Sequence, residues 1–390
     1  MNATPVPAGP AAPPNPAVPL GMPAVRRRVA REGAGCRGRP DVPGLIDRFG
    51  RTAVDLRVSL TDRCNLRCRY CMPAEGIEPM PGERILTDEE VVRLVRIGVQ
   101  ELGVREVRFT GGEPLLRKGL EGIVAATSRL TTWNGAPVET SLTTNGLGLV
   151  HRATGLKAAG LGRVNVSMDS ADRRTYAMLT RRDRYGDAVA GARAAARAGL
   201  LPVKVNAVLM PGANDRQAPD LLLQSLLAGY RLRFIERMPL GPPGTWRAQD
   251  VVTADEILGM LRRHFDLALR PAEERGASPA QEWDVAPGRA LGVEHPGGSV
   301  GVIASVTRPF CGDCDRTRLT SDGMVRSCLF STEETSLRDL LRGGGDDAQI
   351  AARWADAMWA KPAAHGLNID TFARASRTMS RIGGESPLIS

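Results

Sequence analysis

The chain has 390 residues, which is enough for about two or three domains or for one large α/β barrel with an appendage. Its 42% hydrophobic and 24% charged residues are ordinary for a globular protein, and no run of roughly 18 apolar residues predicts a membrane-spanning helix. The net charge of +9 is compatible with a polyanionic ligand, although a general bias towards arginine is the simpler explanation, and an aromatic content of 4% disfavours a stacking platform for single-stranded nucleic acid.

Residues 1–48 are rich in Pro, Ala and Arg and keep neither a helical nor a strand periodicity for long. We therefore expect a disordered N-terminal extension, in which Cys36 is a bystander. The order of basic and apolar residues that marks a secretory signal is absent, and no serine precedes Ser59, as a transit peptide would usually require.

From about residue 51, short apolar runs alternate with helical patterns. The sequence predicts strands at 54–60, 106–110, 139–142, 163–168, 202–209 and 231–236. It predicts helices at about 87–102, 118–130, 149–159, 186–199 and 215–229. A capping box formed by Thr87 and Glu90 marks the start of the first helix. Such alternation implies a parallel sheet with right-handed crossovers, which either closes into a barrel or stops as an open arc.

Functional groups of such sheets gather at the carboxyl ends of the strands. Four expected strands end in polar or glycine-containing sequences, namely Thr110-Gly111-Gly112-Glu113, Thr143-Thr144-Asn145-Gly146, Ser167-Met168-Asp169 and Glu236-Arg237-Met238. The two glycines at 111 and 112 would let the backbone approach a ligand closely, and Glu113 would suit an ammonium group.

Residues 239–246 have the composition of a linker. We expect residues 49–245 to form the strand–helix domain and residues 246–335 a second segment, with a helix near 253–264 and a strand at 299–306. Residues 336–390 complete the chain, with a helix over 336–360 and a Gly383-Gly384 pair near the end.

The first candidate metal site is Cys64-x-x-x-Cys68-x-x-Cys71, which follows the first expected strand. Three thiolates at this spacing can hold three corners of an iron–sulfur cube, and they leave one metal position open for a further ligand. Zinc normally takes four ligands, so a zinc knuckle completed by a distant residue is the alternative.

A second group of cysteines consists of Cys311, Cys314 and Cys328. It again offers three thiolates, and a zinc ribbon would need a fourth ligand from outside, for which His295 and Cys36 are the plausible residues.

Arg316 and Arg318 lie between these cysteines, two positions apart on an expected strand, so they point the same way. They could pair with an anionic cluster or bind phosphates, and a surface hairpin with incidental arginines is the alternative.

Together, the motifs resemble the radical S-adenosylmethionine (SAM) superfamily, and within it the GTP 3′,8-cyclase family of molybdenum cofactor biosynthesis. The resemblance covers about residues 50–384 and is carried by the phrases at 56–73, 108–115, 142–146, 165–169, 204–206, 233–239, 311–319 and 379–384.

The resemblance implies a role for each matching residue. A SAM-cleaving 4Fe–4S cluster would be held by Cys64, Cys68 and Cys71, and SAM would contact Tyr70, Gly112, Ser167 and Met238. A second 4Fe–4S cluster, whose open iron meets the guanine of GTP, would be held by Cys311, Cys314 and Cys328. GTP would be bound by Arg57, Arg108, Thr143, Lys204, Arg316 and Arg318. Gly383 and Gly384 would act as catalytic residues, although residues 385–390 follow them here.

The fold and reaction implied by the resemblance follow from these roles. We expect an α/β fold with an incomplete (β/α)6 barrel of TIM type, whose mouth is closed by a C-terminal α+β segment carrying the second Fe–S cluster. The SAM-derived 5′-deoxyadenosyl radical would abstract hydrogen from C3′ of GTP, which then cyclises onto C8 to give (8S)-3′,8-cyclo-7,8-dihydroguanosine 5′-triphosphate. The cations of the GTP set suit a triphosphate, and arginine bias does not explain Lys204, because the chain has only four lysines.

The expected partners are GTP, an electron donor such as flavodoxin or ferredoxin, and cyclic pyranopterin monophosphate synthase as the consumer of the product. We expect a cytoplasmic monomer or homodimer that binds neither membrane nor nucleic acid. Two alternatives remain: a peptide-modifying radical SAM enzyme, which usually carries more C-terminal cysteines, and a zinc-containing nucleic-acid-binding module, which explains neither the strand–helix repeats nor the Gly-Gly-Glu sequence.

Overall fold

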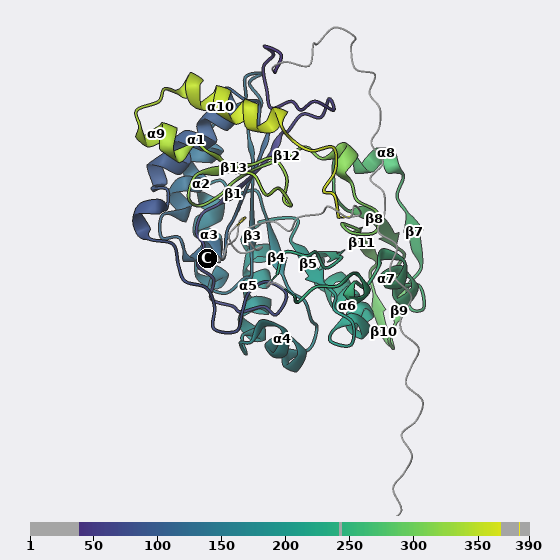
Figure 1. Cartoon of the computed structure of the whole chain (residues 1–390). Coiled ribbons are helices and arrows are strands. Elements are labelled where there is room, and N and C mark those ends of the chain that lie inside the picture. The colour runs from purple at the N-terminus through teal and green to yellow at the C-terminus, as the bar shows by residue number, and fades with distance from the viewer. Residues whose placement is uncertain (1–38, 242–243, 368–381, 383–390) are drawn as a thin grey trace, which may run out of the picture.

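The computed structural model describes residues 39–241, 244–367 and 382. Its centre is a sheet of 12 strands in the spatial order β14-β13-β12-β1-β2-β3-β4-β5-β6-β11-β8-β7 (Figure 1). Every neighbouring pair from β12 to β11 is parallel. A separate antiparallel ribbon pairs β9 with β10.

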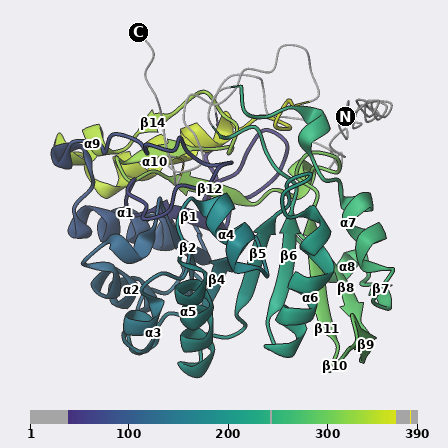
Figure 2. The same ribbon diagram turned by 90° about the horizontal axis from the view of Figure 1, so that it is seen from below.

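The barrel part of this sheet comes from residues 55–235. Its strands are β1 (Asp55–Ser59), β2 (Glu106–Thr110), β3 (Glu139–Thr144), β4 (Arg163–Ser167), β5 (Lys204–Val208) and β6 (Arg231–Ile235). Its helices are α1 (Asp88–Gln100), α2 (Leu120–Ser128), α3 (Leu149–Ala158), α4 (Arg173–Thr180), α5 (Tyr185–Arg197) and α6 (Ala218–Leu227). The helices lie along the outside of the strands (Figure 2). The predicted α/β class and incomplete six-stranded barrel are confirmed.

The barrel stays open because strands from the C-terminal part of the chain occupy both of its edges. β12 pairs with β1 and β11 pairs with β6. The C-terminal strands are β7 (Leu267–Leu269), β8 (Gln281–Val285), β9 (Gly288–Ala290), β10 (Val293–His295), β11 (Gly298–Ile303), β12 (Arg316–Leu319), β13 (Met324–Arg326) and β14 (Thr335–Ser336). The C-terminal helices are α7 (Ala254–Leu261), α8 (Ala272–Arg275), α9 (Arg338–Arg342) and α10 (Asp347–Trp359). The boundary expected between residues 245 and 246 stays a prediction.

Two of the expected helices need correction. The helix expected over 336–360 is interrupted, because three glycines at 343–345 separate α9 from α10. The crossover after β4 contains α4 in addition to the expected helix, and α4 is capped by Asp172, whose side chain accepts a hydrogen bond from the Thr175 amide (2.8 Å).

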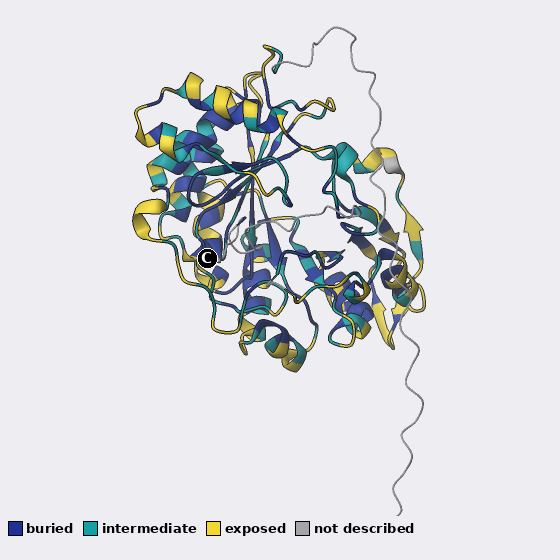
Figure 3. Ribbon diagram, in the orientation of Figure 1, coloured by how far each residue is buried: buried dark blue, intermediate teal, exposed yellow. Residues whose placement is uncertain are grey.

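The core consists of apolar side chains between the sheet and the helices. Along β2 and β5, buried apolar residues alternate with half-buried polar ones, so the apolar side chains pack under the helices and the polar ones face the inside of the barrel. Leu56 and Val58 of β1 and Phe109 of β2 are completely buried. Figure 3 shows buried residues along the sheet and exposed residues on the outward sides of the helices. Among the described residues, no helix has both the length and the apolar character needed to cross a membrane.

The C-terminal helix α10 packs on the first helix of the barrel. Trp354 is fully buried, and its indole nitrogen donates a hydrogen bond to Thr317 Oγ1 (3.0 Å) on β12. A side chain at Gly98 of α1 would come within 3.5 Å of the Trp354 ring, so a small residue lets the two helices approach closely. These contacts fix β12, and the cysteines that precede it, against the barrel.

Candidate active site

A cavity of about 300 Å³ lies at the carboxyl ends of the barrel strands. The four strand ends selected in the sequence line it, and so do both the first cysteine group and Arg318 of β12. From the predicted site, the cavity is lined by Arg57, Cys64, Cys68, Tyr70, Cys71, Arg108, Gly112, Thr143, Ser167, Met238 and Arg318. The structure thus brings most of the predicted residues of the first cluster, SAM and GTP to one place.

The first cysteine group lies on a loop that is pinned to the barrel. The amides of Arg67 and Arg69 donate to the carbonyls of Thr180 (3.0 Å) and Leu179 (2.9 Å) at the end of α4. Burial raises the pKa of the Cys68 thiol well above its usual value, and the negative charges of Asp169 and of the two neighbouring cysteines raise it further. All three cysteines line the same cavity, and iron ions bound between them would stabilise their thiolate forms.

The Gly-Gly-Glu sequence fits tightly against the cysteine loop. The Gly112 amide donates to the Thr61 carbonyl (2.8 Å), and a Cβ at Gly112 would lie 2.2 Å from the backbone oxygen of Arg63. The backbone that Gly112 approaches most closely is therefore that of the cysteine loop itself. A larger residue here would push the loop, and the cysteines on it, away from β2.

The carboxylate of Glu113 is fully engaged within the protein. It is 1% exposed and accepts hydrogen bonds from the Thr144 hydroxyl (2.6 Å) and from the amides of Asn145 (2.7 Å) and Leu115 (3.0 Å). Burial raises the pKa of Glu113 to about 7. Glu113 joins the end of β2 to the end of β3, and its expected contact with an ammonium group stays a prediction.

Tyr70 and Asp169 form a buried pair in the wall of the cavity. The Tyr70 hydroxyl donates to Asp169 Oδ2 (2.8 Å), and the Val208 amide donates to Asp169 Oδ1 (2.9 Å). Burial raises the pKa of Asp169 to about 6, and burial together with the Asp169 charge raises the pKa of Tyr70. Sequence reasoning did not select Asp169 as a site residue, although it stands in one of the quoted phrases.

A layer of arginines and carboxylates crosses the barrel below the cysteine loop. Asp55 pairs with Arg57 (2.9 Å), and Glu106 pairs with Arg108. Burial alone would raise the pKa of Asp55, but Arg57 and Arg108 lower it far below its usual value. Arg316 and Arg318 add two more cations to this layer. Burial and the charges of Arg57 and Arg316 lower the pKa of Arg318, as expected where cations outnumber the carboxylates around them.

The same layer contains Lys204 and a buried arginine that sequence reasoning missed. Arg233 is 6% exposed and donates to Asn206 Oδ1 (3.0 Å) and Asn165 Oδ1 (3.0 Å). Burial, followed by repulsion from Arg233, lowers the pKa of Lys204 to about 8. The sequence did contain a signal for Arg233, because this charged residue lies inside an apolar expected strand and belongs to the phrase 233–239 that carries the resemblance. Lys204 and Arg316 do not line the cavity but belong to the charged layer behind it.

Two donors of this layer lack a hydrogen-bond partner within the described residues. Arg108 Nε and Arg316 Nε are buried and have no hydrogen-bond partner among the described residues. Arg316 Nε lies 3.8 Å from Asp55 Oδ2, which is an ion pair too long for a hydrogen bond, so both Nε atoms keep the capacity to donate to an anion.

The second cysteine group lies at the opposite ends of the strands from the first. The pairing of β1 with β12 places Arg57 beside Arg318. Cys64 follows β1, whereas Cys314 immediately precedes Asp315 and β12. The second group therefore does not close the mouth of the barrel as expected; it lies at the amino ends, and arginines occupy the strands between the groups.

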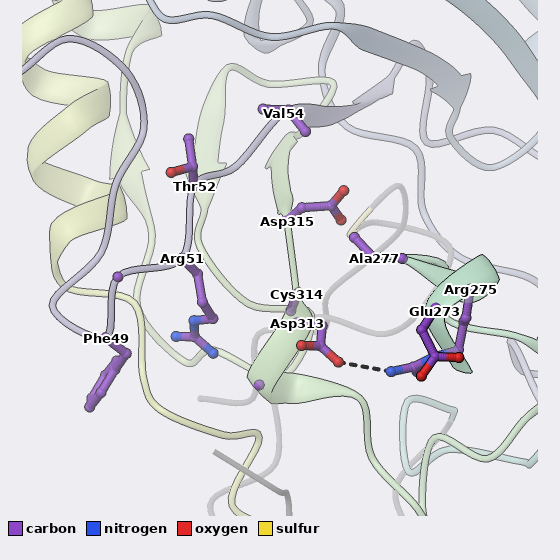
Figure 4. A pocket seen from close by; sticks show the side chains of 13 residues that line it. Phe49, Arg51, Thr52, Val54, Glu273, Arg275, Ala277, Asp313, Cys314 and Asp315 are labelled. Carbon is purple, nitrogen blue, oxygen red and sulfur yellow. Dashed lines mark hydrogen bonds and ion pairs between the residues drawn. The ribbon is translucent and has the colours of Figure 1, made fainter. Parts of the chain in front are cut away.

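The three cysteines of the second group are close to one another. Burial raises the pKa of Cys311 to about 11, to which the thiols of Cys328 and Cys314 contribute. Burial alone would raise the pKa of Cys314, but Lys361 and Arg316 lower it below its usual value. Cys314 also lies at the edge of a solvent cavity of about 580 Å³ (Figure 4).

The structure adds little to the case for zinc. His295 is buried on β10 against Phe265, with ring centroids 5.3 Å apart, and Cys36 lies outside the described residues. Within the described part of the chain, no three His, Cys, Asp or Glu side chains are arranged to hold a single metal ion.

One described residue near the end of the chain, Ile382, lies beside the first cysteine group. Gly383 and Gly384 lie outside the described residues, but Ile382 is 2% exposed and lines the same cavity as Cys64. It packs with Leu240 and Phe330 in a small apolar cluster.

Comparison with protein families gives two matches, which follow one another along the chain. Residues 58–224 match the family described as "Radical SAM superfamily", and residues 230–367 match the one described as "Molybdenum Cofactor Synthesis C". A protein of Corynebacterium glutamicum named GTP 3′,8-cyclase is 56% identical over 343 residues, covering 87% of this chain and 89% of that protein. A protein of Streptomyces coelicolor with the same name is 54% identical over 362 residues, covering 92% and 100%.

Solved structures show a similar fold at low sequence identity. Streptococcus suis SuiB superposes with a TM-score of 0.50 at 14% identity, covering 80% of this chain and 67% of that one. The native anSMEcpe structure with bound AdoMet has a TM-score of 0.50 at 14% identity, covering 80% of this chain and 81% of that one. Both support the partial barrel.

Proposed function

Because this chain belongs to the GTP 3′,8-cyclase family of radical SAM enzymes, we propose that its two cysteine groups hold two 4Fe–4S clusters at opposite ends of one GTP site. The enzyme uses SAM and acts in molybdenum cofactor biosynthesis. When bound, the first cluster would supply the electron that cleaves SAM to methionine and a 5′-deoxyadenosyl radical; this radical would take the C3′ hydrogen of GTP, and one further electron and one proton would complete the bond between C3′ and C8 of guanine. The protein's own part is to bind, orient and shield the reactants.

The first cluster would be held by Cys64, Cys68 and Cys71. Their thiols line one cavity, and three protein ligands leave an iron open for SAM. SAM would lie between Tyr70, Gly112, Ser167 and Met238, which line the same cavity. The hydrogen bond from Tyr70 to Asp169 fixes the ring beside the cysteines.

The GTP triphosphate would lie against the charged layer. The observation that carries this proposal is the register of β1 and β12, which places Arg57 beside Arg318 between the two cysteine groups. The Nε atoms of Arg108 and Arg316, which make no hydrogen bond within the described residues, would donate to phosphate oxygens. Lys204 and Arg233 add positive charge on the far side of the barrel, and Thr143 lines the cavity. The second cluster, held by Cys311, Cys314 and Cys328, would then face the guanine base.

We also propose that Gly383 and Gly384 act beside the reactants, because Ile382 lines the cavity. The test compares the full chain with one stopped after Gly384 and one stopped after Ile382. Stopping after Gly384 should preserve cyclisation, whereas stopping after Ile382 should lower it by about 100-fold, because misplaced reactants lose rates of this order. Equal cyclisation by both truncated chains would refute the role of the glycines.

The cell compartment and the partner proteins of the enzyme are proposed from its chemistry. Thiolate clusters persist in a reducing compartment, which favours the cytoplasm. Cys64 also borders an outer cavity of about 490 Å³, which gives an electron donor such as flavodoxin or ferredoxin a short path to the first cluster. The product would pass to cyclic pyranopterin monophosphate synthase, and the enzyme would be a monomer or homodimer.

The decisive experiment is an anaerobic reconstitution with iron and sulfide, followed by incubation with GTP, SAM and dithionite. We expect about eight irons per chain, because each cluster has four, and GTP-dependent formation of 5′-deoxyadenosine and a cyclised guanosine triphosphate detected by mass spectrometry. SAM cleavage without cyclisation, by the full chain and by the chain stopped after Gly384, would indicate another substrate. Zinc in place of iron would exclude the radical mechanism.

A further inference from the structure

A buried lysine with no role above is bonded to a cysteine of the second group. Lys361 follows α10, is 3% exposed and is one of four lysines in the chain. Its Nζ donates to the backbone oxygens of Cys314 (2.9 Å) and Arg316 (3.0 Å) and lies 3.5 Å from Cys314 Sγ. The ammonium thus has three acceptors for its three protons, and one of them is the sulfur.

The segment that carries Lys361 is held against the Cys311–Asp313 turn by further bonds. Arg51 donates from Nη1 to the carbonyls of Cys311 (2.7 Å) and Ala363 (2.8 Å), so one guanidinium joins both stretches of chain. The backbone of His365 is hydrogen-bonded to the Cys311 thiol. Arg51 and Cys314 lie on the wall of one cavity (Figure 4). Lys361 is therefore fixed in place.

A purely structural role explains this lysine poorly. Carbonyl oxygens alone can be satisfied by a neutral amide or by water, whereas burying a full charge is costly unless an anion is near. The charged groups that act most strongly on the Cys314 thiol are Lys361, Arg316 and Arg318, and all three are cations. A further buried cation among them is favourable when Cys314 is a thiolate bound to an anionic cluster.

We propose that Lys361 is a positioning residue of the second cluster, whose ammonium donates an N–H···S hydrogen bond to Cys314 and thereby raises the reduction potential of that cluster. This inference rests on the proposed function, since it requires the cluster. Reduction adds one electron to the cluster, no bond forms or breaks, and Lys361 keeps its proton. The added negative charge is stabilised by the nearby ammonium, so the reduced form gains more than the oxidised form.

The test is a redox titration of the reconstituted full chain, with dithionite and mediators, followed by electron paramagnetic resonance. A chain with Cys64, Cys68 and Cys71 replaced by Ala identifies the signal of the second cluster. Lys361→Met and Lys361→Gln should both shift this signal to more negative potentials, and Lys361→Arg should stay near the unchanged chain. The first cluster is the internal control, and Lys157→Met, at an exposed lysine of α3, is the matched control.

Four outcomes decide the matter. A negative shift in Lys361→Gln, which keeps donors but loses the charge, supports the inference, even where Lys361→Met binds only about four irons. Unchanged potentials in Lys361→Met and Lys361→Gln at full iron content overturn it. Loss of the second cluster from all three variants overturns it as well, because the lysine would then serve only to fold the site. Absence of the second cluster from the unchanged chain would overturn the proposed function itself.

Discussion

Arg231 and Arg233 are two positions apart on β6, but only Arg233 is buried in the charged layer. If the layer binds the triphosphate, Arg233→Gln should weaken GTP binding by about tenfold or more, because a charge-assisted hydrogen bond contributes about 1.5–3 kcal/mol. Arg231→Gln, at the exposed end of the same strand, is the matched control and should bind GTP normally. Isothermal titration calorimetry measures both, and equal affinities in the two variants would remove Arg233 from the binding site.

If Lys204 binds GTP as proposed, its lowered pKa should make GTP binding sensitive to pH. Burial and the surrounding arginines lower the pKa of its ammonium to about 8, so the free protein loses this charge as the pH rises through 8. A bound triphosphate favours the charged form, so binding above pH 8 requires uptake of a proton. We expect the dissociation constant of GTP to rise by up to about tenfold per pH unit above 8.

The control for this prediction is Lys204→Arg, because arginine remains charged over the same range. Calorimetry between pH 7 and about pH 9.5, in buffers of different ionisation enthalpy, counts the protons taken up. A pH dependence that Lys204→Arg leaves unchanged would assign the titration to another group.

Residue identity and spacing singled out the two cysteine groups, and the first of them does line the cavity at the strand ends. They did not suffice for Arg233, because a cation on a strand has the same sequence signal whether it faces solvent or a buried layer. Nor did they show that Glu113 is bonded to Thr144 and Asn145, since these donors come from the end of another strand.

At the scale of elements, Glu236 joins three segments behind the cavity. Its buried carboxylate accepts hydrogen bonds from the amides of Ala254 (2.9 Å), Val306 (2.8 Å) and Thr307 (2.8 Å) and from the Thr307 hydroxyl (2.5 Å). These donors begin α7 and follow β11, whereas Glu236 itself ends β6 and leads directly to Met238. The carboxylate therefore fixes the C-terminal segment against the barrel.

We expect Glu236→Gln to lower the free energy of unfolding by about 2–3 kcal/mol, because an amide offers one acceptor oxygen to donors arranged for two. The matched control is Glu256→Gln in the capping box of α7, where glutamine also serves, so its effect should stay within about 0.5 kcal/mol. Urea unfolding measures both variants. Equal stability of the two would show that the Glu236 bonds contribute little.

The success of prediction differed between elements for a physical reason. The barrel strands have five or six residues with a buried apolar face, and the limits of all six lie within two residues of the expected ones. β7, β9 and β10 have only three residues each, too few to show a period, and the sequence did not reveal them. The pairing of β12 with β1 joins strands more than 200 residues apart, which no local pattern encodes.

For the whole molecule, that pairing means that the barrel and the C-terminal segment should unfold together. Each edge of the barrel is hydrogen-bonded to a C-terminal strand, and Trp354 of α10 is buried against β12 and α1. Removing the C-terminal strands would expose both edges and the apolar face beneath α10. We therefore expect one urea transition, with coincident midpoints for far-ultraviolet circular dichroism and for tryptophan fluorescence. If the circular dichroism signal of the helices were lost at a higher urea concentration than the tryptophan fluorescence signal, the barrel would be stable alone. The cation layer would then not depend on β12, the strand that places Arg318 beside Arg57.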